Sequence, residues 1–146
     1  MNKKSGIFII FILIIVTCFF VLREPEIIYV HEDEDSTVII VRNFPITQWG
    51  KIYWWENNKD MMNAKYQLPR VDAAGNYYVS ILDGSDGFKK VTEANLYWFS
   101  FEHTDLYCFN EIKSEDRCIE KNFLMQIHNG MKNKTDYFIK GDYVTK

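Results

Sequence analysis

The side chains that could do chemistry in this chain are few, and they do not form a recognisable catalytic pattern. The three histidines are His31, His103 and His128, and none lies within a metal-binding or nucleophile motif. Serines are few, and the G-x-S-x-G pattern of a nucleophile elbow does not occur. Enzymes need an activated nucleophile, a carboxylate pair or a metal site. The sequence therefore predicts a protein that is not an enzyme and that uses no cofactor or metal.

The two cysteines in the second half of the chain, Cys108 and Cys118, carry the clearest covalent signal. A metal site usually has closer spacing, as in C-x-x-C, together with two more ligands. A disulfide is the expected alternative in an oxidising compartment. Closing a loop of this length would contribute about 3 kcal/mol in the chain-entropy model. We therefore expect a Cys108–Cys118 bridge.

Two acidic stretches contain potential cation ligands. The first, HEDEDS at 31–36, is a continuous charge run, which is typical of a solvated linker. The second, DGSDGFKK at 83–90, offers only Asp83, Ser85 and Asp86 before a glycine, and this does not match the EF-hand pattern. We expect a flexible turn at 83–90, which could serve as a recognition loop because loops often carry function.

The N-terminal segment Ser5–Leu22 has no charged residue and predicts a membrane helix. At 1.5 Å per residue it would span about 27 Å, close to the roughly 30 Å hydrocarbon core of a bilayer. The bilayer is therefore an expected partner. The residues that we expect to anchor the chain in it are Gly6, Ile7, Phe8, Ile9, Ile10, Phe11, Leu13, Phe19, Phe20 and Leu22.

Two processed forms are alternatives to an uncleaved anchor. A cleavable signal peptide usually has a shorter apolar region and a small-x-small cleavage site, whereas bulky residues occupy positions 19–22. The sequence IVTC resembles a lipoprotein signal with Cys18 as the lipidated residue, but Thr17 is larger than the usual Gly or Ala. An uncleaved anchor is the preferred interpretation.

Charges on the two sides of the span predict its orientation. Lys3 and Lys4 precede it and mostly acidic residues follow Arg23, so the positive-inside rule places the N-terminus in the cytoplasm. In a bacterium the rest would be a periplasmic domain on the inner membrane. Without Lys3 and Lys4, the 17 basic residues fall to 15 against 20 acidic ones, a net charge near −5. That balance disfavours nucleic acid as a partner, because phosphate binding needs a basic surface.

The elements that must position any site divide the chain into three parts, namely a cytoplasmic tip and anchor at 1–22, an acidic stalk at 23–36 and a folded domain at 37–146. One main helix packed on a mostly antiparallel sheet, an α+β fold, is expected for the domain. Apolar and aromatic runs predict strands at 37–41, at 77–82 with Tyr77, Val79 and Ile81 on one face, at 96–101, 106–109 and 122–128, and a hairpin at 136–144 around Gly141 and Asp142.

The main helix is predicted to begin after Thr47 as N-cap and to end before Pro69. At about 100° per residue, one apolar face gathers Trp49, Ile52, Trp55, Met62 and Tyr66. Trp54 and Met61 fall on the opposite side, as a second buried layer or as an exposed anchor for a partner. The candidate binding surface comprises Tyr53, Trp54, Met61, Asp83, Asp86 and Phe88.

Two functions from different classes follow. The first is a membrane-tethered module that binds a periplasmic protein, for example an immunity protein that neutralises an envelope-targeting toxin. The second is a glycan-binding module whose aromatics, such as Tyr53, Trp54 or Trp98, stack on sugar rings beside amides such as Asn57. An aromatic flanked by apolar side chains favours a protein partner, and an isolated ring framed by amides favours a sugar.

Several motifs resemble a known family. The segment 41–88, with the NFP turn, GKIYWWENNK and the tyrosine before QLP, is similar to the enterobacterial membrane proteins grouped as domain of unknown function 943, as are LYCFNEI and RCIEKN at 106–112 and 117–122. The similarity covers nearly the whole chain. It implies a single N-terminal span and an exported domain, and it brings no activity or binding residues. The DGSDGF segment departs from the family, which often has a more aromatic run there.

Overall fold

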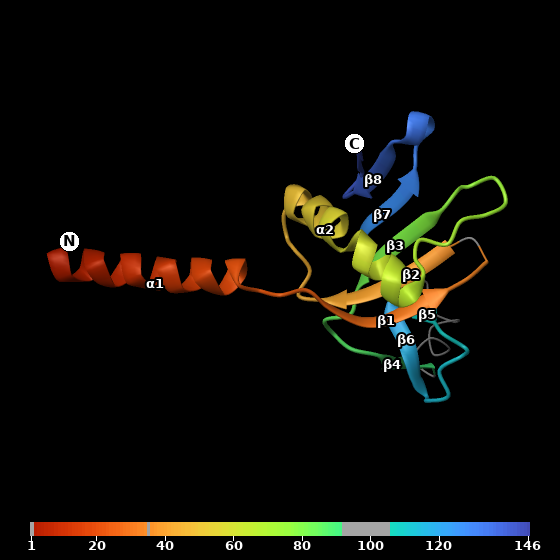
Figure 1. The fold of residues 1–146 in the computed structure, drawn as a ribbon. Helices are drawn as coiled ribbons and strands as arrows, with labels where there is room; N and C mark the ends of the chain where they lie inside the picture. Colours follow the sequence, from red (N-terminus) through yellow and green to blue (C-terminus); the bar gives the residue numbers. More distant parts are fainter. Residues whose placement is uncertain (1, 35, 92–105) are drawn as a thin grey trace.

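The computed structural model describes residues 2–34, 36–91 and 106–146, which form a long N-terminal helix followed by an α+β domain (Figure 1). The long helices are α1, Lys3–Val21, and α2, Gln48–Tyr66. The strands are β1 Glu26–Glu32, β2 Ser36–Arg42, β3 Tyr78–Asp83, β4 Lys89–Lys90, β5 Leu106–Cys108, β6 Asp116–Glu120, β7 Phe123–Asn129, β8 Thr135–Ile139 and β9 Asp142–Thr145, and a 3-10 turn, η1, spans Met131–Asn133. The predicted fold class is confirmed.

A sheet with the strand order β1-β2-β3-β7-β8-β9 forms the centre of the domain. Strands β2 and β3 are parallel, and the other neighbouring pairs of this sheet are antiparallel. Parallel neighbours need a crossover connection, and α2 supplies it. The helix packs on one face of the sheet, as Figure 1 shows.

Strand β2 is buried on both faces, as its apolar sequence predicts. Ile39 and Val41 pack towards α2, whereas Ile40 packs on the other face against Leu82 and Phe109. All five side chains are almost fully buried. Because burying one such side chain is worth roughly 1.5–3 kcal/mol, this strand holds the two hydrophobic clusters of the domain together.

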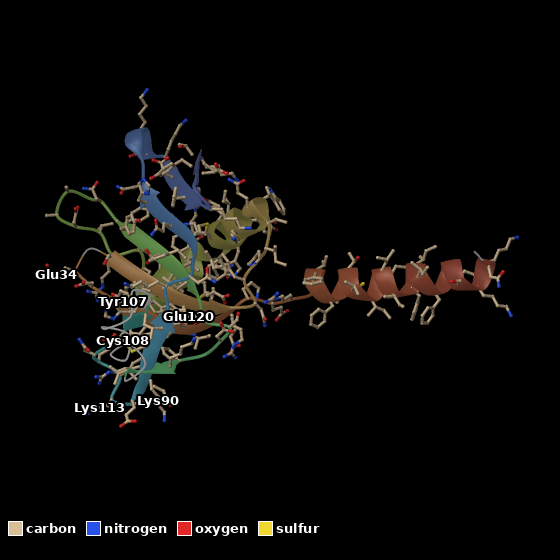
Figure 2. The ribbon with its side chains drawn as sticks, turned by 180° about the vertical axis from the view of Figure 1, so that it is seen from behind. Glu34, Lys90, Tyr107, Cys108, Lys113 and Glu120 are labelled. Atoms are coloured by element: carbon tan, nitrogen blue, oxygen red, sulfur yellow. A yellow bond between two sulfur atoms is a disulfide. The ribbon has the colours of Figure 1, made fainter. Side chains whose placement is uncertain are left out.

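A smaller sheet of order β4-β6-β5 lies against the face opposite α2. Cys108 and Cys118 are directly opposed in β5 and β6 and form the predicted disulfide. Figure 2 shows Tyr107 and Cys108 in the part of the domain that is remote from α1. Gly84 lies where this layer meets the main sheet, and a Cβ there would come within 2.5 Å of the Ile40 side chain.

Helix α2 begins and ends where the sequence predicts. The Thr47 hydroxyl accepts a hydrogen bond from the Gly50 amide at 3.0 Å, which satisfies one of the free amides of the first turn. The chain leaves the helix through Gln67 in the left-handed conformation, two residues before Pro69.

The buried face of α2 differs from the predicted one. Trp49, predicted in the core, is 69% exposed, and Trp54, predicted on the opposite side, is buried with its ring 5.0 Å from that of Phe44. The buried residues of the helix are Lys51, Ile52, Trp54, Trp55 and Met62. Their arc centres near 280° on the helical wheel, about 140° from Trp49. The predicted apolar face of α2 included Trp49, and this shifted the predicted centre of that face away from Trp54.

The acidic stalk is a second correction. The structure places Glu26–Glu32 in β1, an edge strand paired antiparallel with β2, where we expected a solvated linker. The apolar run at 27–30 explains the difference, because Ile27 and Val30 pack towards α2 while Ile28 and Tyr29 pack on the other face. The segment that joins α1 to the domain is therefore only residues 22–25.

Helix α1 extends from the domain, and none of its residues is buried (Figures 1 and 2). Lys3–Val21 is long and apolar enough to cross a membrane, and among the described residues it is the one helix that is. After it, the Arg23 Nε donates a hydrogen bond to the Asn43 Oδ1 at 3.1 Å. This contact joins the end of the anchor segment to the loop before α2.

Strands β3, β5, β7, β8 and β9 lie where the sequence predicts strands, to within one residue at their ends. Strands β4 and β6 were not predicted, because Lys89–Lys90 falls in the expected flexible turn at 83–90 and the polar segment Asp116–Glu120 becomes a strand only by pairing with β4 and β5. Tyr77, Val79 and Ile81 lie towards α2, as predicted. The β8–β9 hairpin turns through Lys140 and Gly141, whose φ angles of 51° and 91° suit a tight turn. The predicted strand at 96–101 and His103 lie outside the described residues.

Candidate functional site

The residues proposed from the sequence as a binding surface do not meet in one place. Trp54 is buried and is not an exposed anchor, whereas Tyr53 and Met61 are exposed on α2. Phe88 contacts the rings of Tyr29 and Phe109 on the opposite face of the main sheet. The structure therefore does not bring Tyr53, Trp54 and Phe88 together on one surface.

The acidic residues of that proposed surface lie in the turn after β3. Asp83 ends the strand, and its Oδ1 accepts hydrogen bonds from the Ser85 amide at 3.0 Å and the Ser85 hydroxyl at 2.5 Å. Asp86 is exposed in the same turn. Asp83 thus shapes the turn through its contacts with Ser85.

A different group of polar and aromatic side chains gathers across the main sheet. Tyr78 in β3 is opposite His128 in β7, which is opposite Asp136 in β8. Tyr143 in β9 is opposite Phe138, two residues after Asp136. Residues opposed in register share one face of a sheet, and the residues next to them pack towards α2, so this set faces away from the helix. We call Tyr78, His128, Asp136 and Tyr143 the tyrosine face.

The rings of the tyrosine face contact one another. The rings of Tyr78 and His128 are stacked, with centroids 6.1 Å apart and an interplanar angle of 16°. Tyr143 meets His128 edge-on at 6.3 Å and lies 4.8 Å from Phe138. Tyr78 is 41% exposed and Tyr143 is 71% exposed, so both can contact a ligand. Burial raises the pKa of Tyr78, and the nearby Tyr143 raises it further.

Asp136 is held in place at the centre of this face. Its Oδ1 accepts a hydrogen bond from the Thr145 hydroxyl at 2.5 Å, and its Oδ2 lies 3.6 Å from the His128 Nε2. Gly130 allows the carboxylate to approach, because a Cβ there would lie 2.5 Å from the Asp136 Oδ2. The carboxylate therefore has a defined position beside the imidazole.

An open hollow of about 510 Å³ adjoins the Tyr78 end of the tyrosine face. Its lining residues are Ser36, Asp72, Asn76, Tyr77, Tyr78, His128 and Asn129. The hollow lies at the end of the sheet where β2 and β3 begin. The other end of β2 is next to Asn43, whose side chain bonds Arg23 at the end of the anchor segment. A seven-residue strand is about 23 Å long, so the hollow lies at the end of the sheet remote from α1.

Hydrogen bonds fix the wall of this hollow. Asp72 accepts hydrogen bonds from the backbone amides of Ala74 and Asn76, both at 2.8 Å. These bonds lower the pKa of the Asp72 carboxyl, and the bond from Asn76 has the largest effect. Asn129 accepts from the Tyr77 amide at 3.0 Å and donates to the Gly75 carbonyl at 2.9 Å. The loop therefore presents its amide groups beside Tyr78 in a defined geometry.

A second polar cluster joins β1 to the disulfide-bonded sheet. The Tyr29 hydroxyl donates to the Glu111 Oε1 at 2.7 Å, and the His31 Nδ1 contacts the same oxygen. Desolvation and this hydrogen bond raise the pKa of Tyr29 to about 12. Desolvation alone would raise the pKa of Glu111, but the hydrogen bonds that it accepts lower it. The cluster ties β1 to the loop between Cys108 and Cys118, and it places no nucleophile beside His31 among the described residues.

A third contact joins α2 to β8. The Tyr137 hydroxyl donates to Glu56, which also accepts from the Lys59 Nζ at 2.8 Å. Desolvation and the contact with Glu56 raise the pKa of Tyr137. Desolvation would raise the pKa of Glu56, but the bonds from Lys59 and Tyr137 lower it. This arrangement stabilises the packing of the helix on the sheet.

In the part of the chain that the structure describes, no three His, Cys, Asp or Glu side chains are grouped so that they could hold a metal ion. The tyrosine face was missed from the sequence because its members are far apart in the chain. The available signal was strand alternation, since Tyr78 precedes the buried Val79 and His128 follows the buried Ile127. Only the strand order brings them together.

Comparison with known proteins identifies a family. The family model described as "Enterobacterial putative membrane protein (DUF943)" matches residues 2–145. No curated protein and no solved structure matches the chain.

Proposed function

The chain belongs to the enterobacterial membrane protein family DUF943, and we propose that it is an anchored binding protein without catalytic activity. In this proposal α1 spans the inner membrane and the domain is periplasmic. Lys3 and Lys4 before the span, and the acidic β1 region after it, support that orientation. The Cys108–Cys118 bridge also suits an oxidising compartment.

Reporter fusions test the orientation. Alkaline phosphatase, which is active only after export, should be active when fused after Lys146. A fluorescent reporter that matures only in the cytoplasm should stay dark at the same position. The reverse pair of results would contradict a periplasmic domain.

We propose that the ligand is a saccharide chain of the cell envelope, bound at the hollow beside Tyr78. The observation that carries this proposal is the half-exposed Tyr78 ring framed by Asn76 and Asn129. Sugar rings offer apolar C–H faces to an aromatic ring and hydroxyl groups to amides and carboxylates. Asn76 and Asp72 supply such polar groups, and the loop bonds hold them in position.

The hollow also lies at a suitable place for this ligand. It is at the end of the sheet remote from α1, so an anchored domain would direct it away from the bilayer. The rings and amides are fixed by stacking and by hydrogen bonds, which reduces the entropy cost of binding.

Co-sedimentation with isolated peptidoglycan sacculi tests the saccharide proposal. The detergent-solubilised full-length protein should sediment with sacculi, and Tyr78→Ala should remain in the supernatant. Tyr53→Ala is the matched control, since Tyr53 is an exposed tyrosine on α2, away from the hollow. Equal sedimentation of all three proteins, or no sedimentation of the wild type, would contradict the proposal.

The second candidate is the protein-interaction role that the sequence favours, including immunity toward an envelope toxin. The observation in its favour is Tyr143, which is 71% exposed and packs beside Phe138, so it is an aromatic flanked by an apolar side chain. Tyrosine is enriched at binding hot spots. A pull-down of full-length protein from envelope and secreted fractions should then give a stoichiometric partner that Tyr143→Ala loses and Tyr53→Ala retains.

A further inference from the structure

The side of the domain nearest α1 carries three exposed apolar side chains. Ile46 is 59% exposed, Trp49 is 69% exposed and Tyr53 is 55% exposed. The Trp49 and Tyr53 rings are stacked, with centroids 4.9 Å apart and planes 19° apart. They lie in the loop before α2 and its first turns, and Figure 1 shows that the start of α2 is on the α1 side of the domain.

A basic hollow adjoins these side chains. Arg23, Ile46, Lys51 and Lys140 line an open space of about 360 Å³, and Asp83 also contributes to its wall. Lys51 is only 3% exposed, and its ammonium group has no hydrogen-bond or ion-pair partner among the described residues. Burial lowers the pKa of Lys51, and the nearby Lys140 lowers it further. Asp83 lines the hollow without forming an ion pair to either lysine, so an anion placed between Lys51 and Lys140 would stabilise their charged forms.

The position of the hollow indicates where the anion comes from. Arg23 follows α1 by two residues and is bonded to Asn43, three residues before Ile46. Residues 22–25 can reach at most about 14 Å when fully extended. If α1 crosses the bilayer, the hollow and the exposed rings therefore lie at the lipid headgroups. Tryptophan and tyrosine are enriched at this depth of a membrane, and basic residues there attract anionic lipids.

We propose that this side of the domain docks on the bilayer, with the phosphate of an anionic phospholipid held between Lys51, Lys140 and Arg23. Ile46, Trp49 and Tyr53 enter the headgroup region beside it. Docking fixes the domain upright on its short connection, so that the hollow beside Tyr78 faces away from the membrane. The proposal holds for either orientation of α1 and does not depend on what Tyr78 binds.

Fluorescence quenching in reconstituted vesicles tests this docking. The full-length protein and Trp49→Phe are inserted into vesicles of equal parts phosphatidylethanolamine and phosphatidylglycerol, with or without bromine on the upper acyl chain. The difference between the two proteins isolates the Trp49 emission, since Trp54, Trp55 and Trp98 are common to both. Brominated lipid should quench this emission, and iodide in the aqueous phase should not. Quenching of the Trp49 emission by iodide without quenching by brominated lipid would overturn the proposal. Quenching by neither reagent would also overturn it, because that result would show that Trp49 is covered by protein.

The charge requirement is tested separately. Replacing phosphatidylglycerol by phosphatidylcholine should reduce the lipid quenching, and Lys140→Gln should weaken docking roughly fivefold in the anionic vesicles, as expected for loss of one lysine at a charged surface. Lys140 is exposed, so this variant leaves the core intact. Lys134→Gln, an exposed lysine outside the hollow, is the control. Inorganic phosphate added at constant ionic strength should not reduce the quenching of Trp49 by brominated lipid. A reduction would show that the hollow binds free phosphate instead of a lipid headgroup and would overturn the proposal. Equal quenching in both lipids would overturn the role of the lysines.

Discussion

The imidazole of His128 lies almost parallel to the ring of Tyr78, with centroids 6.1 Å apart and planes 16° apart. These residues are fifty positions apart in the chain, and the β3–β7 register brings them directly opposite each other. The stacked pair borders the hollow in which we propose that a saccharide binds. Its geometry depends on the central sheet, so variants that damage the core must be separated from variants of the site.

The two tryptophans Trp49 and Trp54 should differ strongly in their effect on stability. Trp54→Ala removes a buried ring that contacts Phe44 and should cost about 3–5 kcal/mol of unfolding free energy. Trp49→Ala removes an exposed ring and should change the unfolding free energy by at most about 0.5 kcal/mol. Denaturant unfolding of the full chain in detergent micelles measures both. Similar losses of unfolding free energy in the two variants would contradict the assignment of Trp54 to the buried face of α2 and of Trp49 to its exposed face.

The disulfide should contribute measurably to the stability of the small sheet. Cys108→Ser with Cys118→Ser opens a loop whose ends are ten residues apart and should cost about 2–3 kcal/mol. Loss of near-ultraviolet circular dichroism on heating reports the change. Cys18→Ser serves as the matched control, because Cys18 is exposed on α1 and unpaired. A double variant as stable as the control would contradict the bridge.

Glu56 should make stability depend on pH. Its folded-state pKa is lower than the ordinary 4.5, so its contribution is complete above that value and is lost as pH falls through the folded pKa. We expect Glu56→Gln to be about 1–3 kcal/mol less stable than the wild type near neutral pH, with the difference closing as the pH falls below 4.5 and through the lowered pKa of Glu56.

Unfolding of wild type, Glu56→Gln and Tyr137→Phe at several pH values checks this expectation. Tyr137→Phe should reduce the pH dependence, since one of the two bonds to the carboxylate is lost. Glu26→Gln is the control, because the Glu26 carboxylate is exposed and, among the described residues, forms an ion pair with Arg42 at 3.6 Å. A constant difference between wild type and Glu56→Gln at every pH would refute the role of the charge.

Gly84 should not tolerate a side chain. Gly84→Ala would place a Cβ 2.5 Å from Ile40 and 2.8 Å from Ile28, so we expect a loss of about 1–3 kcal/mol from overpacking. Thermal unfolding compared with Gly6→Ala, where nothing lies within 4 Å, measures this loss. Equal stability of the two variants would contradict the close packing of the two layers.

The sequence was sufficient where local signals were strong. The apolar run at 37–41, the Thr47 cap and the hairpin turn at Gly141 were each predicted correctly, because a buried strand, a helix start and a two-residue turn have local determinants. The Cys108–Cys118 bridge was also predicted correctly, since the alternative of a metal site lacked the closer cysteine spacing and the two further ligands that it needs.

Other features depended on long-range packing. The charges around 31–36 concealed the short apolar run at 27–30, which becomes an edge strand only because β2 is available to pair with it. Three consecutive aromatics at 53–55, with Trp49 before them, allowed more than one apolar face on α2, and only the docking of the helix on the sheet selected it. The tyrosine face requires the order of β3, β7, β8 and β9, which no local pattern encodes.

The most direct measurement is the affinity of the full-length protein for soluble glycan fragments released from peptidoglycan sacculi. Calorimetry in detergent micelles should give saturable binding to the wild type and to Tyr53→Ala. Tyr78→Ala should bind at least about tenfold more weakly, a loss of about 1.4 kcal/mol, while unfolding at the same temperature as the wild type. Absence of binding by the wild type, or equal affinity of Tyr78→Ala, would contradict a saccharide site at Tyr78.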